Sequence, residues 1–135
     1  MLPATFKLEI ATPERLLVSA DVKEAQIPGE GGYLGILPGH APLLSALQPG
    51  VISYPREGHT DRLVVTWGYV EVLPTKVTVL AEAAEKVEEI DVARAEKSLQ
   101  RAVDRLKQAS VDVDVARAQA AVRRATARLT VVGKL

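Results

Sequence analysis

The residues with the clearest chemical potential are arginines in the last third of the chain. Arg94 and Arg101 are seven positions apart, and Arg117 and Arg124 repeat that spacing, with Arg128 one turn further on. On a helix, a spacing of seven places two side chains on one face. Clustered guanidinium groups bind polyphosphate well because each offers charge-assisted hydrogen bonds in a fixed geometry. Two such helices side by side would therefore form a phosphate receptor.

Neighbouring residues support this interpretation, but a plainer one also fits. Lys97 and Arg105 lie close to the arginine rows, and the carboxylates of Glu85 and Asp91 are suitable acceptors for an adenine amino group or a ribose hydroxyl. The plainer interpretation is a solvated helix face on which acidic and basic residues pair. Nucleic acid is a third alternative, disfavoured because residues 91–135 hold no aromatic side chain for base stacking. Spacing alone leaves these alternatives open.

No recognisable catalytic or metal-binding set accompanies the two histidines. A catalytic base needs a nucleophile and an orienting acid, and a metal needs further ligands. His59 lies in the polar stretch 56–61 and is predicted to be an exposed loop residue. His40 lies between Pro-Gly and Ala-Pro dipeptides and is predicted to stabilise a turn or to contact a partner. With no cysteine in the chain, we expect neither catalytic residues nor a metal site.

The glycines of residues 29–35 do not form a nucleotide-binding loop. Leu34 occupies a position where a dinucleotide fingerprint needs glycine, and no Gly-Lys-Ser/Thr phosphate loop exists in the chain. We therefore predict that these glycines are turn and bulge positions that need positive φ.

The elements that position these residues change type near residue 85. All eight prolines and eight of the nine glycines come before it. Pro28-Gly29, Pro38-Gly39 and Pro49-Gly50 mark turns about ten residues apart, which is typical of a sandwich or barrel of short antiparallel strands. Apolar and polar residues alternate over 6–10 and 70–72. Leu63 and Val65 alternate with Val64 and Thr66, so both faces carry an apolar side chain, which predicts a strand covered on both faces.

After residue 85 the apolar period becomes helical. Two seams with spacings of three and four indicate two helices; their members are Val92, Ala95, Leu99, Ala102, Leu106 and Ala109, then Val115, Ala118, Val122, Ala125, Leu129 and Val132. Residues 110–112 allow only a tight reversal, so the helices form an antiparallel hairpin. Asp91 is the predicted N-cap of the first, and Asp112 or Asp114 of the second. The alanine-rich seam buries little apolar area, so the hairpin is weakly held.

Charge divides the chain at the same place. Residues 1–90 hold 7 Lys/Arg and 12 Asp/Glu, whereas residues 91–135 hold 10 and 5. The basic part therefore favours an acidic protein surface, a nucleotide or a nucleic acid as its partner. No apolar run reaches the ~20 residues of a membrane span, and residues 1–10 lack the pattern of a signal peptide. We expect a cytoplasmic protein that reaches a membrane only through a partner.

Several stretches resemble the epsilon subunit family of bacterial F-type ATP synthases, whose mitochondrial counterpart is delta. The most specific is the run from Pro28 to Leu44, with Leu-Gly-Ile-Leu-Pro-Gly-His-Ala-Pro-Leu at its centre. Residues 12–15, 67–72 and 77–81 also fit. Residues 90–95 are similar to the family's Ile/Leu-Asp-x-x-Arg-Ala helix opening, and residues 124–129 resemble its closing helix. The resemblance spans essentially the whole chain.

The resemblance implies an α+β fold: an antiparallel β-sandwich of about ten strands over residues 1–85, then a two-helix hairpin over residues 86–135. The sandwich would dock on the gamma subunit and on the ring of c subunits, with the loop from Gly31 to His40 facing the ring. Some relatives carry an acidic residue where this chain has Gly31 or Gly32, and Glu30 would substitute for it. The implied interface residues are Glu30, Gly31, Tyr33, Leu34, Leu37 and His40.

For the hairpin, the resemblance implies a movable regulatory arm. Folded on the sandwich it permits rotation, and extended into the catalytic head of alpha and beta subunits it inhibits ATP hydrolysis. ATP would be a regulatory ligand that holds the arm down, and no cofactor would be required. The matching residues are Glu85, Ile90, Asp91, Arg94, Ala95, Arg101, Arg124 and Arg128. The chain would then be a non-catalytic rotor subunit, bound to no nucleic acid and peripheral to the cytoplasmic face of the inner membrane.

Overall fold

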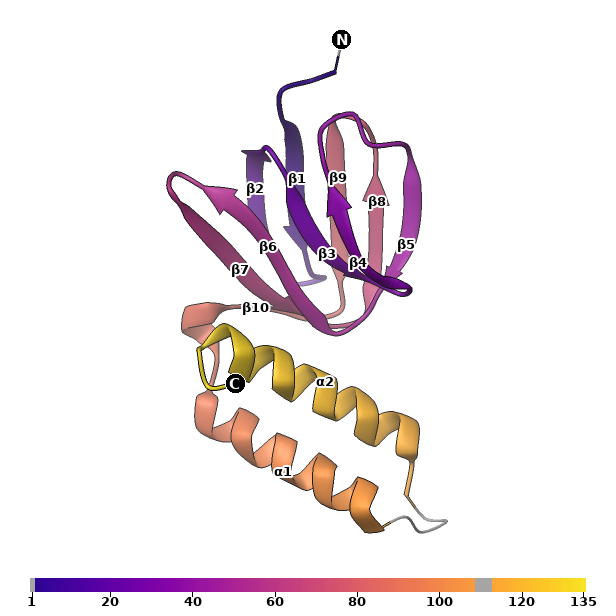
Figure 1. The fold of residues 1–135 in the computed structure, drawn as a ribbon, viewed down its shortest axis with the longest axis vertical. Coiled ribbons are helices and arrows are strands. Elements are labelled where there is room, and N and C mark those ends of the chain that lie inside the picture. The colour runs from indigo at the N-terminus through magenta and orange to yellow at the C-terminus, as the bar shows by residue number, and fades with distance from the viewer. Residues whose placement is uncertain (1, 109–112) are drawn as a thin grey trace.

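The computed structural model describes residues 2–108 and 113–135 (Figure 1). The predicted seam residue Ala109, the reversal at 110–112 and the alternative cap Asp112 lie outside the described residues. The described elements are β1 (Phe6–Ala11), β2 (Leu16–Val22), β3 (Ala25–Gly29), β4 (Gly32–Ile36), β5 (Leu43–Leu47), β6 (Gly50–Arg56), β7 (His59–Val65), β8 (Gly68–Val72), β9 (Lys76–Ala81), β10 (Ala84–Lys86), the 3₁₀ turn η1 (Val87–Glu89), α1 (Val92–Gln108) and α2 (Val115–Val131).

The strands fold into a sandwich formed by one continuous hydrogen-bonded sheet. Its order is β10-β7-β6-β3-β5-β8-β9-β1-β2, and β4 pairs with β3. This confirms the predicted sandwich and hairpin, with one correction to the antiparallel pattern. β1 pairs in parallel with β9, with Lys7 opposite Lys76. Neighbouring parallel strands cannot be joined by a tight turn, and here most of the sandwich sequence lies between them.

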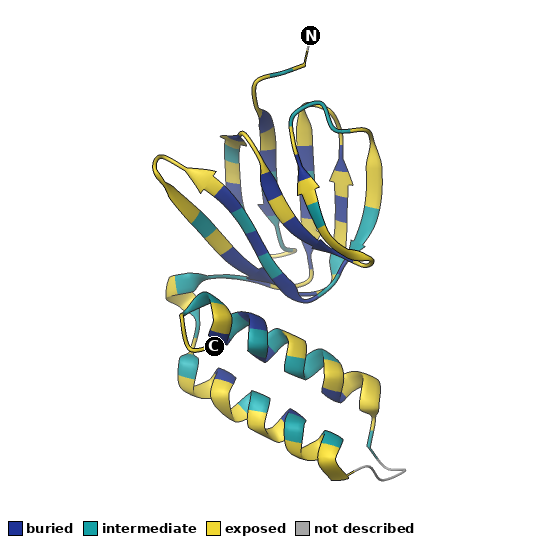
Figure 2. Ribbon diagram, in the orientation of Figure 1, coloured by how far each residue is buried: buried dark blue, intermediate teal, exposed yellow. Residues whose placement is uncertain are grey.

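The sandwich core is built from the inward faces of the strands (Figure 2). Phe6, Leu8 and Ile10 are at most 2% exposed, so the predicted alternation of β1 is confirmed. On β7 the side chains of Leu63 and Val65 join the main core cluster. Val64 is buried but does not belong to that cluster, because it lies on the other face of the sheet, where α2 packs on β6 and β7. The prediction that this strand is covered on both faces is confirmed.

One of the three predicted turns is wrong. Pro38-Gly39 forms a turn, and Pro49 lies in the short link between β5 and β6, but Pro28 and Gly29 belong to β3. The turn that follows β3 is formed by Glu30 and Gly31. β3 pairs with β6 at Gln26 and with β5 at Gly29. Pro28 therefore lies where the strand passes from one neighbour to the next, and such irregular positions tolerate a residue without an amide hydrogen.

Glycine 32 is the member of the 29–35 stretch for which positive φ is confirmed. Its φ is 128°, whereas the other glycines of this fully described stretch have no positive φ. Gly29 has a different reason to be glycine, because a Cβ there would meet the Gly32 carbonyl oxygen and the Leu34 side chain at 3.1 Å.

The arm consists of α1 and α2, and α2 lies between α1 and the sandwich (Figure 1). Asp91 Oδ1 accepts from the Arg94 amide and Asp114 Oδ1 accepts from the Arg117 amide, each at 3.0 Å, so the predicted caps Asp91 and Asp114 are confirmed. Four seam alanines are buried, which lets the helices approach closely; they are Ala95, Ala102, Ala118 and Ala125. Ala127 is also buried, although it is not a seam residue.

We predict that Gly68→Ala strongly destabilises the sandwich. Gly68 has a φ of 151°, and a Cβ there would collide with the Leu80 carbonyl oxygen on β9. The clash involves backbone on both sides and cannot be relieved by a rotamer change, so we expect a loss of about 3 kcal/mol in the free energy of unfolding. Urea denaturation measures it. Gly35→Ala is the matched control, since no atom lies within 4 Å of its Cβ position; equal losses in the two variants would contradict the prediction.

Candidate anion site and docking surfaces

Part of each predicted arginine row lines a depression between the two helices. Its volume is about 180 Å³, and its lining residues are Ser98, Arg101, Ala102 and Arg105 from α1 with Ala121, Arg124 and Arg128 from α2. Arg94 and Arg117, the first members of the predicted rows, are not among them. The two lining arginines of each helix are four residues apart and so share a helix face. The antiparallel packing turns both faces toward the same depression. Four guanidinium groups around so small a volume form a site suited to an anion.

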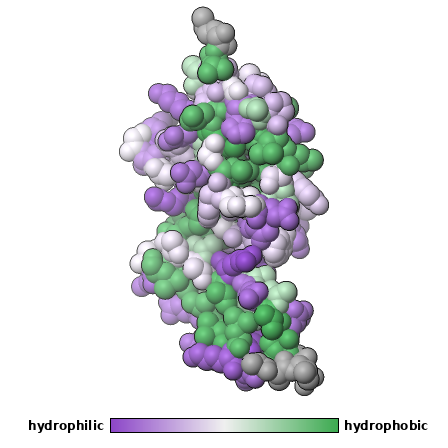
Figure 3. Space-filling view, turned by 45° about the vertical axis from the view of Figure 1, so that its right-hand side comes forward, coloured by the Kyte–Doolittle hydropathy of each residue, from purple (hydrophilic) through white to green (hydrophobic). Residues whose placement is uncertain are grey.

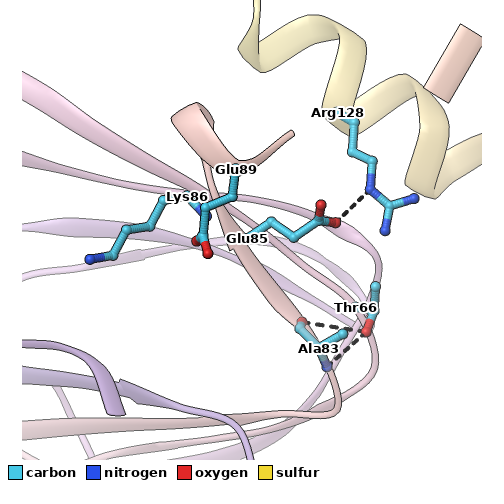
Figure 4. Close-up of polar contacts among 6 residues, drawn as sticks. All are labelled: Thr66, Ala83, Glu85, Lys86, Glu89 and Arg128. Atoms are coloured by element: carbon cyan, nitrogen blue, oxygen red, sulfur yellow. Dashed lines mark hydrogen bonds and ion pairs between the residues drawn. The ribbon is translucent and has the colours of Figure 1, made fainter. Parts of the chain in front are cut away.

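At one end of this depression, Arg128 joins the arm to the sandwich (Figure 4). Its Nε donates to Glu85 Oε1 on β10 at 2.6 Å, and the two side chains are 26% and 29% exposed. Beside this pair, the Thr66 hydroxyl accepts from the Ala83 amide at 3.2 Å and fixes the chain as it enters β10 (Figure 4). Glu85 therefore already has a cationic partner while the arm is folded, and any ligand of Arg128 must share that guanidinium with it.

The remaining predicted nucleotide residues lie outside the lining of the depression. Ile90 follows η1, Asp91 caps α1, and Ala95 is buried in the seam. Arg94 has an exposed side chain one turn before Ser98 on the same helix face. The structure thus brings Arg101, Arg124 and Arg128 together, links Glu85 to them, and leaves the other four at the start of α1.

An ion pair at the junction between the sandwich and the arm had no sequence signal. Arg15 Nη2 donates to both carboxylate oxygens of Glu89, at 2.8 and 2.7 Å, and Glu89 Oε1 also accepts from the Lys86 amide at 2.8 Å. The hydrogen bond from the Lys86 amide, followed by that from Arg15, holds the pKa of Glu89 below its ordinary value. The charged carboxylate is therefore favoured by folding, and this contribution to stability disappears as pH falls through the lowered pKa.

The predicted interface residues do not form one compact loop. Glu30 and Gly31 form the turn before β4, whereas Leu37 and His40 follow its opposite end. Tyr33 is 59% exposed, although its hydroxyl accepts from the Val51 amide at 3.0 Å.

The other residues of this set face inward or are held in place by the fold. Leu34 packs partly against the sandwich core. The His40 amide donates to the Leu37 carbonyl at 3.1 Å, and the His40 ring Nδ1 lies 2.7 Å from the Ala41 carbonyl oxygen, so its position in a turn is confirmed. The other histidine, His59, is exposed as predicted, but it is the first residue of β7 and not a loop residue. Its Nε2 lies 2.8 Å from Asp61 Oδ1.

Sequence reasoning missed an exposed apolar face on the sandwich. Tyr69 on β8 is 62% exposed and lies directly opposite Leu80 on β9, which is 58% exposed. Leu44 on the adjacent β5 is 70% exposed. Figure 3 shows apolar side chains gathered over the sandwich and again over the arm. The signal was present in the sequence, because β8 and β9 carry apolar residues on both faces. Exposed large apolar side chains gathered on one face are typical of an interface with another protein.

Larger depressions flank β2, but their charges are mixed. One of about 780 Å³ lies between β2 and the β6–β7 turn, and its charged lining residues include Asp21, Lys23, Arg56 and Glu57. Opposite charges in one open depression neutralise each other and select no ligand of either sign. The arginine depression is smaller, but its lining carries charge of one sign.

Together, the fold and these surfaces define a two-part binding module: a β-sandwich with an exposed apolar face, and a helical arm with clustered arginines. Two family models cover nearly the whole chain. The beta-sandwich domain of the ATP synthase Delta/Epsilon chain matches residues 5–87, and the long alpha-helix domain of the same chain matches residues 88–133. The chain belongs to the ATP synthase delta/epsilon chain family.

Curated relatives are similar over most of their length. An ATP synthase epsilon chain from Koribacter versatilis (strain Ellin345) is 57% identical over 103 residues, covering 76% of this chain and 72% of that protein. The ATP synthase epsilon chain of Bacillus subtilis (strain 168) is 47% identical over 130 residues, covering 96% and 98%. The second alignment includes the arm as well as the sandwich.

Two solved structures share the fold. A chain in the cryo-EM structure of Euglena gracilis mitochondrial ATP synthase, OSCP/F1/c-ring in rotational state 1, superposes with a TM-score of 0.82 at 24% identity, covering 96% of this chain and 82% of that chain. A chain of the Tetrahymena thermophila mitochondrial ATP synthase central stalk/c-ring gives 0.60 at 16% identity, covering 96% of each. In the described part of the present chain, neither helix has the length and apolarity to cross a membrane.

We predict that Glu85 and Arg128 are energetically coupled. Each single alanine variant leaves a partly buried charge without its partner, and the double variant removes both. A double-mutant cycle with Glu85→Ala and Arg128→Ala should give a coupling of about 1–2 kcal/mol in urea denaturation. The same cycle on Arg56 and Asp61 should give a coupling of less than about 0.5 kcal/mol. In this pair Arg56 Nη1 lies 3.5 Å from Asp61 Oδ2, and the Arg56 side chain is 54% exposed. Comparable values for the two pairs would contradict the prediction.

Proposed function

We propose that this chain is a non-catalytic central-stalk subunit of a proton-translocating F-type ATP synthase, which couples the gamma subunit to the c-ring and inhibits ATP hydrolysis through its C-terminal arm. Family membership supports the assignment to the synthase. The Euglena and Tetrahymena structures contain the c-ring, and the second is of the central stalk. Through these partners the chain lies at the cytoplasmic face of the inner membrane without entering the bilayer. It requires no cofactor.

The observation that carries the regulatory part is the limited attachment of the arm. α2 packs on β6 and β7, whereas among the described residues the main packing partner of α1 is α2. Two side-chain hydrogen bonds join α2 to the sandwich: Arg128 to Glu85, and Arg123 Nη1 to Gln48 Oε1 at 3.1 Å. An attachment of a few contacts can be released without unfolding the sandwich. The released basic helices then meet acidic surface of the alpha and beta subunits.

ATP is the ligand we assign to the folded arm. A ligand shifts a two-state equilibrium only through a difference in affinity for the two states. The arginine depression draws on both helices and, through Arg128, on the sandwich. Its geometry therefore depends on the folded arm. ATP at 100 times its dissociation constant favours the folded state by ~2.7 kcal/mol, which is comparable to the few contacts that hold α2.

The size of the depression decides which part of ATP it holds. Its volume of about 180 Å³ is below the ~300–1,000 Å³ of sites that enclose a whole small molecule. We assign it to the phosphates, held by Arg101, Arg124 and Arg128. The nucleoside then lies toward the start of α1, where the resemblance places Ile90, Asp91, Arg94 and Ala95.

The nucleotide assignment predicts a contrast between two arginines of α2. Arg124 lines the depression, whereas the exposed Arg117 on the same helix is not among its lining residues. Calorimetric titration of the isolated chain with ATP should show at least a tenfold loss of affinity in Arg124→Ala, because charge-assisted bonds to phosphate are lost.

Arg117→Ala removes the same charge from a position of α2 outside the lining and is the matched control. We expect its affinity to stay within about threefold of the parent chain, since a general change in net charge acts weakly at a distance. Equal losses in the two variants would refute the depression as the phosphate site. A steady-state ATPase assay on the same samples should show no turnover; measurable turnover would contradict the non-catalytic role.

For docking, we assign the exposed apolar face of Leu44, Tyr69 and Leu80 to the gamma subunit. Burial of large apolar side chains is the main source of affinity at such interfaces. The residues Glu30, Gly31, Tyr33, Leu34, Leu37 and His40 remain our candidates for the contact with gamma and the c-ring. These residues lie within β4 and beyond both of its ends, so they form an extended strip along the sandwich and not a single point of contact.

The docking assignment predicts that Tyr69→Glu weakens gamma binding by at least tenfold. A charge in the centre of an apolar interface is desolvated without a partner. Sedimentation of the purified chain with purified gamma subunit measures the dissociation constant. Thr60→Glu places the same charge on an exposed position of β7 and should leave binding unchanged. If both variants bind gamma as well as the parent chain, the face serves another purpose.

A further inference from the structure

The junction between the sandwich and the arm is capped on both sides of a single extended residue. On the sandwich side, η1 is closed by a capping arrangement in which Glu89 Oε1 accepts from the Lys86 amide. On the arm side, Asp91 caps α1. Ile90 between them has φ −78° and ψ 125°, an extended conformation. The backbone groups on the two sides of Ile90 are thus hydrogen-bonded within two separate local structures. A rotation of the backbone at Ile90 therefore changes the direction of the chain at the lowest cost in hydrogen bonds.

The sandwich side of this junction is held by a residue far away in the sequence. Arg15 lies in the β1–β2 connection, immediately before β2, and its Nη2 contacts both oxygens of the Glu89 carboxylate at 2.8 and 2.7 Å. One carboxylate therefore organises η1 through the Lys86 amide and fastens it to the β1–β2 connection. The side chains of Arg15 and Glu89 are 47% and 35% exposed, so the contact is reachable by water and can be broken without unfolding the core.

We propose that the Arg15–Glu89 ion pair is a positioning clamp that keeps η1 part of the sandwich and confines arm movement to a pivot at Ile90. This inference deepens the proposed function, because a pivot matters only if the arm moves. With the clamp closed, the arm has one direction of departure and returns to the same place on β6 and β7. With the clamp broken, residues 86–90 loosen, and the arm leaves the sandwich more often.

The experiment compares the parent chain with Arg15→Ala in two measurements. The first is amide hydrogen exchange by NMR at residues 86–90, with the Ala95 amide as an internal reference inside α1. The second is energy transfer between dyes on Thr60→Cys of β7 and Gln108→Cys of α1, which can be labelled cleanly because the chain has no cysteine of its own. Both are recorded with and without ATP.

We expect Arg15→Ala to accelerate exchange at residues 86–90 by about two- to fivefold, the range for loss of an exposed but well-aligned ion pair. Ala95 should keep its protection, and the population with separated dyes should rise by a similar factor. Lys76→Ala is the matched control, because it breaks another exposed ion pair, with Glu9, and neither residue of that pair lines the depression beside residues 86–88. Glu89→Gln should resemble Arg15→Ala in loosening the junction.

The outcomes separate the clamp from the proposed function. Unchanged exchange at residues 86–90 in Arg15→Ala overturns the clamp. Equal acceleration in Lys76→Ala overturns it as well, because the effect is then one of general stability. Faster exchange with an unaltered dye separation at every ATP concentration supports the clamp and refutes the moving arm.

Discussion

The burial of α2 from two sides is the constraint on which the arrangement of the arm depends. One side of this helix packs on α1 through alanines, and the other packs on the outer face of β6 and β7, where it covers Val64. Helices joined by so little apolar area are marginal in water on their own. The sandwich thus supplies the second surface that α2 needs. When α2 leaves the sandwich, the hairpin must pack on another protein surface, or the contacts between its two helices weaken.

Charge reinforces this arrangement at its edges. The sandwich sequence is acidic and the arm sequence is basic, and the ion pair of Arg128 with Glu85 joins one to the other. Arg101, Arg105 and Arg124 line the depression between the helices together with Arg128. A folded arm therefore concentrates like charges that repel one another, and a bound anion relieves the repulsion. The arginines that bind the ligand therefore also destabilise the folded arm when no ligand is bound.

Local patterns predicted much of this structure, and long-range contacts were beyond them. The alternation in β1 and the seams of the helices could be found because side-chain direction follows a fixed period in each element. The sandwich core and caps such as Asp91 followed from those periods and from residue type. The pairing of β1 with β9 and the clamp between Arg15 and Glu89 join residues far apart in sequence, and no spacing rule links them. The convergence of Arg101 with Arg124 needed the hairpin geometry as well as the helix period. Pro28 misled because a proline is compatible with both a turn and a strand corner.

The parallel pairing of β1 with β9 has a consequence for how the chain is made. β1 leaves the ribosome before its neighbour β9, which follows about 70 residues later. The N-terminal strand must wait for a partner from the end of the sandwich sequence, so the platform closes as a unit near the end of synthesis. The arm emerges after the sandwich sequence, when the surface that receives α2 is already being completed. Translation order therefore delivers the basic helices to a finished acidic domain, and limits the time in which they are exposed to other chains.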